Sequence, residues 1–86
     1  MKIREGYMVR EVAGVALVVP LGADATFQGM MKLNETGRLL WEKLTRETDR
    51  DGLVDALLSE YDVARDVAER DVEAFLARLV ALGVGE

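Results

Sequence analysis

The sequence predicts an α+β fold, in which a three-stranded antiparallel sheet is followed by three helices. Apolar and polar residues alternate along the first third, as they do in half-buried strands. In the remaining two thirds, apolar residues recur at the spacing of one helical face. The two patterns meet once, in residues 27–44, where a strand pattern leads into a helix pattern through a capping residue. With 86 residues, the chain is expected to form one domain over residues 1–86.

The first two strands are expected to form a hairpin. Tyr7–Val12 alternates loosely, and Ala13-Gly14 supplies a turn because glycine readily adopts the positive φ of a tight reversal. Val15–Val19 is a β-branched run that predicts a more buried strand, ended by Pro20. Short connections between strands favour an antiparallel meander.

After a loop over residues 21–26, the third strand is predicted at Phe27–Leu33. One face of this strand would carry Phe27, Gly29, Met31 and Leu33. The opposite face would carry Gln28, Met30 and Lys32. Asn34 follows as an expected N-cap, because its side chain can accept hydrogen bonds from the first turn of a helix.

The first helix is predicted over residues 35–46. Its buried face would be Gly37, Leu40, Trp41 and Leu44. Glycine inside a helix costs about 1 kcal/mol relative to alanine. We therefore expect Gly37 to permit the close approach of a neighbouring backbone.

Two further helices are expected. Thr48 and Asp51 approximate a capping box for the second helix, which runs to about Glu60, and Asp49 is the competing cap. The third helix is predicted over residues 65–82, and Gly83 is expected to end it in the left-handed region. Its buried stripe would contain Ala68, Val72, Phe75, Leu76, Leu79 and Leu82.

The composition argues against catalysis. The chain has no Cys and no His, so zinc–thiolate sites and the commonest general base are excluded. Glu69 and Glu73, like Asp51 and Asp55, are spaced four apart, but they fall on polar helix faces beside basic residues. These pairs are expected to be a solvated surface. We therefore expect no enzyme activity, no metal site and no cofactor.

The charge balance also restricts the partners. Sixteen acidic and eleven basic residues give a net charge of −5, which repels phosphate backbones and argues against nucleic acid. A set of cations near the first two helices is interleaved with acidic residues: Arg38, Lys43, Arg46 and Arg50. No apolar run is long enough to span a bilayer, and the N-terminus lacks the apolar core of a signal peptide. A cytoplasmic protein with no membrane association is expected.

The third strand is a candidate binding element. An open strand edge beside an amphipathic helix can accept an extended peptide as an additional strand, and methionine suits an adaptable surface. Alternatively, Lys32 and Gly29 only protect this edge against unwanted pairing. The residues alone leave both interpretations open.

Leu33-Asn34-Glu35-Thr36-Gly37, followed by Leu40-Trp41 and Leu44, resembles the signature of PqqD-like proteins, the family that includes the D component of pyrroloquinoline quinone biosynthesis. The resemblance extends over nearly the whole chain. It implies a winged helix-turn-helix-like domain that recognises ribosomally made, post-translationally modified peptides. Such domains bind the precursor's leader as a strand added to the third strand and present the core peptide to a partner, often a radical SAM enzyme.

The resemblance also implies the site residues. The docking edge would be Phe27, Gln28, Gly29, Met30, Met31, Lys32 and Leu33. The helical wall would be Asp71, Ala74, Phe75 and Arg78, although Phe75 also belongs to the predicted core stripe. Asn34, Gly37 and Trp41 match the signature and are interpreted as cap and packing residues.

The leading hypothesis is a stand-alone, non-catalytic protein that binds a leader peptide and passes it to a modifying enzyme. A winged-helix DNA-binding regulator is the second hypothesis. The third is an assembly subunit that pairs with itself through the open strand edge and would form a homodimer.

Overall fold

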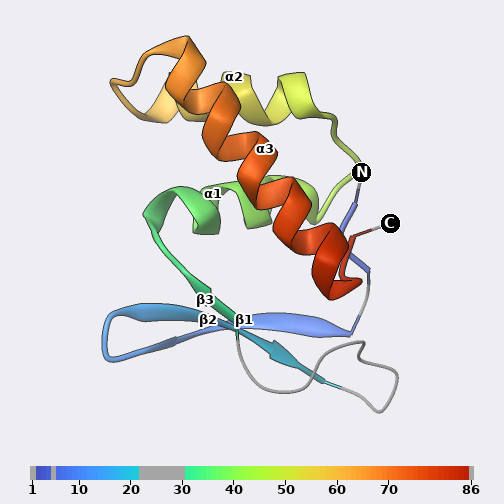
Figure 1. Ribbon diagram of the computed structural model, residues 1–86. Coiled ribbons are helices and arrows are strands. Elements are labelled where there is room, and N and C mark those ends of the chain that lie inside the picture. Colours follow the sequence, from blue (N-terminus) through green and yellow to red (C-terminus); the bar gives the residue numbers. More distant parts are fainter. Residues whose placement is uncertain (1, 5, 22–30, 86) are drawn as a thin grey trace.

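The computed structural model, which describes residues 2–4, 6–21 and 31–85, confirms the predicted α+β fold (Figure 1). Three strands come first, namely β1 (Tyr7–Val12), β2 (Val15–Pro20) and β3 (Met31–Leu33). Three helices follow, namely α1 (Glu35–Leu44), α2 (Arg50–Glu60) and α3 (Arg65–Leu82). The helices lie together on one side of the sheet in Figure 1. The winged-helix comparison is only a loose description of this arrangement.

The sheet is an antiparallel meander with the strand order β1-β2-β3. Ala13 and Gly14 form the hairpin turn with φ of 53° and 80°, so both central residues adopt the left-handed conformation of a type I′ turn. This confirms the predicted turn. The strand β2 continues through Pro20, one residue further than predicted, and Pro20 lies opposite Tyr7.

The third strand can be compared with its prediction only in part. The described part of β3 is Met31–Leu33, and Phe27, Gln28, Gly29 and Met30 lie outside the described residues. The predicted alternation holds where it can be followed, because Met31 and Leu33 are buried and Lys32 is exposed.

Helix α1 begins as predicted. The backbone of Asn34 is extended, and its side-chain oxygen accepts a hydrogen bond of 2.8 Å from the Gly37 N–H. The helix ends at Leu44 and not at Arg46, because Thr45 caps it, donating its hydroxyl to the Glu42 carbonyl at 2.6 Å. The predicted inner face is confirmed, since it is the buried face: Gly37, Leu40, Trp41 and Leu44.

Helix α2 starts one residue after Asp49, whose carboxylate accepts a hydrogen bond of 2.8 Å from the Gly52 N–H. The competing cap is therefore the one used, and the capping box from Thr48 to Asp51 is wrong. Helix α3 has the predicted bounds, and Gly83 ends it with φ of 72°. Of the predicted stripe, Leu76 and Leu82 are only partly buried.

The first and last described segments of the chain meet beside the ends of α1 and α3. Ile3 pairs with Gly85 in an isolated antiparallel bridge, and its N–H donates to the Leu44 carbonyl at the end of α1 at 2.9 Å. The Arg4 N–H donates to the Val84 carbonyl at 2.8 Å. The termini lie side by side in Figure 1, and the buried side chains of Ile3 and Val84 extend the core between them.

Candidate functional site

A hollow of about 550 Å³ lies where β3, the start of α1 and the middle of α3 meet. We call it the groove. Its lining comes from three elements and the Asn34 cap: Lys32, Leu33, Asn34, Thr36, Gly37, Leu40, Asp71, Ala74, Phe75 and Arg78. Since β3 is bonded to β2 alone within the described part of the sheet, the groove runs beside an open strand edge.

Helix α3 provides one wall of the groove through a single stripe. Asp71, Ala74, Phe75 and Arg78 recur at i, i+3, i+4 and i+7, so they share one helical face. Phe75 is only 9% exposed and belongs to the core as well as to the lining, as the sequence indicated. The other three are exposed. The stripe thus presents an apolar centre with a carboxylate one turn before it and a guanidinium one turn after it.

Helix α1 provides the opposite wall, and Gly37 leaves space there because it has no side chain. A Cβ at this position would lie 2.9 Å from Asn34 Oδ1 and 3.4 Å from Phe75 Cε1. Glycine is required here because the capping oxygen of Asn34 and the ring of Phe75 occupy the space that a Cβ would need. The predicted close approach of a neighbouring backbone is therefore wrong, because side chains, not a backbone, occupy the space.

The structure brings together most of the predicted site residues and adds others. Lys32, Leu33, Asp71, Ala74, Phe75 and Arg78 all line the groove. Met31 does not, since its side chain is buried in the core. The four residues from Phe27 to Met30 lie outside the described part of the chain.

The sequence interpretation missed Thr36 and Leu40 as lining residues and gave Asn34 and Gly37 structural roles only. A signal was available, because Thr36 and Leu40 are four residues apart and flank Gly37 on the same helical face. The face that packs and the face that lines the groove overlap at this helix. Periodicity alone therefore assigned the whole stripe to the core.

The hairpin turn determines which main-chain groups of β3 face the open edge. Val12 and Val15 flank the two turn residues and form a hydrogen-bonded pair. The main-chain N–H and C=O groups of Val15 and of every second residue after it in β2 are therefore directed toward β1. Leu21, six residues after Val15, fits this alternation, since its N–H donates to the Gly6 carbonyl at 2.7 Å. The main-chain N–H and C=O groups of the intervening residues Ala16 and Val18 are then directed toward β3.

Ala16 and Val18 lie opposite Leu33 and Met31, which makes those two the hydrogen-bonded residues of β3. Lys32, between them, directs its N–H and carbonyl away from β2, toward the open edge. One residue of the described strand therefore offers both a donor and an acceptor to an added chain.

The rim of the groove carries unbalanced charge. Lys32 and Arg78 are cations and Asp71 is an anion, and none of the three takes part in an ion pair with another described residue. The floor between them is apolar. The arrangement suits an extended ligand with an apolar side chain and charged neighbours.

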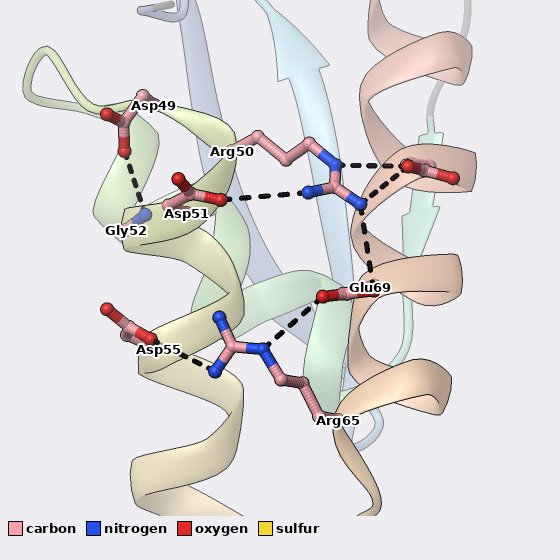
Figure 2. A network of polar contacts seen from close by, with 8 residues as sticks. Asp49, Arg50, Asp51, Gly52, Asp55, Arg65 and Glu69 are labelled. Atoms are coloured by element: carbon pink, nitrogen blue, oxygen red, sulfur yellow. Dashed lines mark hydrogen bonds and ion pairs between the residues drawn. The ribbon is translucent and has the colours of Figure 1, made fainter.

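The carboxylate pairs of α2 and α3 form a different feature, a surface network that joins the two helices (Figure 2). Arg50 donates to Glu73 Oε1 through Nη2 at 2.6 Å and Nε at 3.0 Å, and Arg65 Nε lies 3.3 Å from Glu69 Oε1. Glu73 remains 60% exposed. The prediction of a solvated surface with basic neighbours is confirmed. The hydrogen bond from Arg50 to Glu73 raises the pKa of the guanidinium, and the charges of Glu73, Glu69 and Asp51 raise it further.

The basic residues near α1 and α2 do not gather into one positive face. Arg38 Nη1 lies 3.2 Å from Glu11 Oε2 of β1, and Arg50 is held by the carboxylates of the network. Cations that are already paired gain less from a phosphate backbone. These contacts weigh against the DNA-binding hypothesis.

Within residues 2–4, 6–21 and 31–85, no group of three or more His, Cys, Asp or Glu side chains could hold a metal ion. No helix in this part of the chain has the length and apolar character needed to cross a membrane.

Comparison with known proteins is informative at the level of family and fold. The model of the family described as coenzyme PQQ synthesis protein D (PqqD) matches residues 14–84. The structure "TbiB1 in Complex with the TbiA(beta) Leader Peptide" is similar with a TM-score of 0.76 and 25% identity, covering 98% of this chain and 93% of that one. "Lasso peptide synthetase B1 complexed with the leader peptide" has a TM-score of 0.73 and 24% identity, covering 96% and 93%, and supports the fold alone. No curated protein matches the chain.

Proposed function

The chain belongs to the PqqD family, and from this membership we propose that it is a non-catalytic peptide-binding protein. Its ligand is the leader of a ribosomally synthesised precursor peptide, which docks by β-strand addition to β3. The observation that carries this proposal is the groove itself, a hollow with an apolar floor and a charged rim beside an open strand edge.

The dimensions of the groove suit an extended peptide. From Asp71 to Arg78 the α3 stripe rises about 10 Å, at about 1.5 Å per residue. A strand advances about 3.3 Å per residue, so about three peptide residues match the stripe. On the facing side, the main chain of Lys32 can pair with one residue of the added strand, while alternate peptide side chains enter the groove.

A similar structure supports this choice of ligand. That protein, TbiB1, is in complex with a leader peptide, and its fold covers nearly all of this chain. The apolar floor formed by Leu33, Leu40 and Phe75 can receive one bulky apolar side chain. Lys32 and Arg78 favour acidic neighbours of that side chain, and Asp71 favours a basic one.

The remaining parts of the proposal concern the partners. A domain without catalytic groups must pass its peptide to an enzyme, and the family resemblance favours a modifying enzyme of the radical SAM type. The open edge of β3 also permits a homodimer when no peptide is bound. We place this exchange in the cytoplasm, where precursor peptides are made.

The test is an amide NMR titration of the labelled protein with leader-derived peptide from a precursor encoded nearby. Shifts concentrated at Met31–Leu33 and along residues 71–78, and absent with a scrambled peptide, are the expected result. Shifts of equal size with the scrambled peptide, or none with either, would refute leader recognition. Sedimentation over a range of concentrations distinguishes self-pairing of the edge from peptide binding.

A further inference from the structure

The sheet has a second face, which points away from the helices. Alternation along the strands puts one set of side chains on it: Met8, Arg10, Val12, Val15, Leu17, Val19 and Lys32. The other set faces inward, since Ala16, Val18, Met31 and Leu33 are buried and Glu11 reaches Arg38 of α1. Figure 1 shows the three helices on the inward side only. We call this second set the outer sheet face.

The outer sheet face is unusually apolar for a surface in contact with water. An antiparallel sheet with one solvated face normally alternates apolar residues inside with polar residues outside. Here only Arg10 and Lys32 are polar. Met8 is 40% exposed and Val12 is 56% exposed, and the three apolar residues that β2 contributes are half-buried: Val15, Leu17 and Val19. A contiguous exposed apolar patch rimmed by polar residues is typical of a protein–protein contact.

The charge on this face indicates what covers it. Arg10 lies opposite Leu17, and Leu17 lies opposite Lys32, so two cations flank the apolar centre in one cross-strand row. Among the residues that the structure describes, this face carries no carboxylate, although the whole chain has a net charge of −5. An isologous dimer through this face would bring the same cations together, which costs free energy. An acidic partner suits it better.

We propose that the outer sheet face docks the modifying enzyme through an apolar strip on that enzyme flanked by carboxylates. The inference rests on the proposed function for the identity of the partner. The groove lies between β3 and α3, on the other side of the sheet from Arg10 and Val12, so enzyme and leader peptide can be bound together. Lys32 stands at the border of the two surfaces.

The experiment measures two affinities for each variant. The purified modifying enzyme encoded beside the precursor gene is titrated with the wild type, Arg10→Glu, Leu17→Glu and Val12→Glu, and the leader peptide is titrated in parallel. We expect enzyme affinity to fall about tenfold or more in all three variants, with peptide affinity unchanged. Lys43→Glu on α1 is the matched control, since it makes the same charge reversal on the helical side.

Val12→Glu keeps the test valid if Leu17→Glu fails to fold, because Val12 is already largely exposed at the hairpin end. Enzyme binding that is unchanged in Arg10→Glu and Val12→Glu would overturn the proposal, as would an enzyme that does not bind the wild type. Self-association of the wild type that Val12→Glu abolishes would assign the face to a second copy instead. Enzyme binding without peptide binding would refute the proposed function and leave this docking face standing.

Discussion

Single small residues create the groove. Gly37 has no side chain beneath the capping oxygen and the Phe75 ring, and Ala74 presents one methyl group between Asp71 and Arg78. Larger side chains at these two positions would fill the hollow. Space at a binding site is thus determined by the residues that contribute the least volume to it.

Ala74→Trp is expected to block the groove. Ala74 is exposed, so an indole can be added without entering the core, and it would occupy the volume that a peptide side chain requires. We expect leader affinity to fall about tenfold or more, corresponding to about 1.4 kcal/mol, when measured by isothermal titration. Ala77→Trp, also exposed on α3 but outside the lining, is the control. Equal affinities for the two variants would contradict the assignment.

Asn34→Ala tests the cap that connects strand to helix. Removing the side chain leaves the Gly37 N–H without its 2.8 Å hydrogen bond. Loss of an N-cap costs about 0.5–2 kcal/mol, and urea denaturation should detect a decrease of that size. Asn34→Asp retains an acceptor, so its free energy of unfolding should remain within about a few tenths of a kcal/mol of the wild-type value. A loss as large as that of Asn34→Ala would show that the capping hydrogen bond is not the cause of the lower stability.

At the scale of the elements, the ion pairs between α2 and α3 stabilise the helices, while the edge strand β3 is left open. The network of Arg50 and Arg65 connects α2 to α3 through residues that do not line the groove. Because the hydrogen bond to Glu73 raises the pKa of Arg50 above its ordinary value, the positive charge of Arg50 is fully present below that ordinary value and is lost only as the pH rises through the raised pKa. The α2–α3 pair therefore keeps this contact across the physiological pH range, while β3 remains open to a ligand.

Lys32→Pro tests whether the main-chain N–H of Lys32 faces the open edge of β3 and pairs with the peptide. Proline removes the N–H that faces outward, and proline is tolerated in edge strands where the missing N–H faces away from the sheet. We expect the variant to fold, as judged by circular dichroism, and to lose leader affinity about tenfold. Lys32→Ala keeps the N–H and separates the main-chain effect from the side-chain charge. A variant that folds and binds normally would show that the peptide does not pair with Lys32.

At the scale of the whole molecule, the first residues close the structure. The bonds of Ile3 and Arg4 connect the end of α1 to the segment after α3, so the two ends of the chain share one layer of the core. The sheet supplies two surfaces, one lining the groove and one facing away from the helices. The surfaces that we propose for the leader peptide and for the modifying enzyme therefore share only Lys32.

Ile3→Ala tests this closure. Ile3 is 7% exposed, and truncating a buried isoleucine costs about 2–5 kcal/mol. Since small domains are stable by about 5–15 kcal/mol, we expect a clear loss of stability in urea denaturation. Lys2→Ala, one residue earlier and only partly buried, should change little. A loss confined to Lys2→Ala would place the closure elsewhere.

Local patterns determined most of the elements. The turn at Ala13-Gly14, the cap at Asn34 and the end of α3 at Gly83 each depend on a backbone conformation that few residue types adopt, so they could be predicted from the sequence. The choice of Asp49 over Thr48 could not, because both side chains can accept the same hydrogen bonds. That choice depends on where α2 begins once its apolar face is packed.

The site divides in the same way. The sequence by itself determined the α3 stripe of Asp71, Ala74, Phe75 and Arg78, since helical periodicity places residues on faces. Only the tertiary structure decided that Thr36, Gly37 and Leu40 stand opposite that stripe, and that Lys32 faces outward while Met31 is buried. A hollow exists between elements, and its volume depends on how closely they approach. That distance results from packing across the whole core, which no local pattern contains.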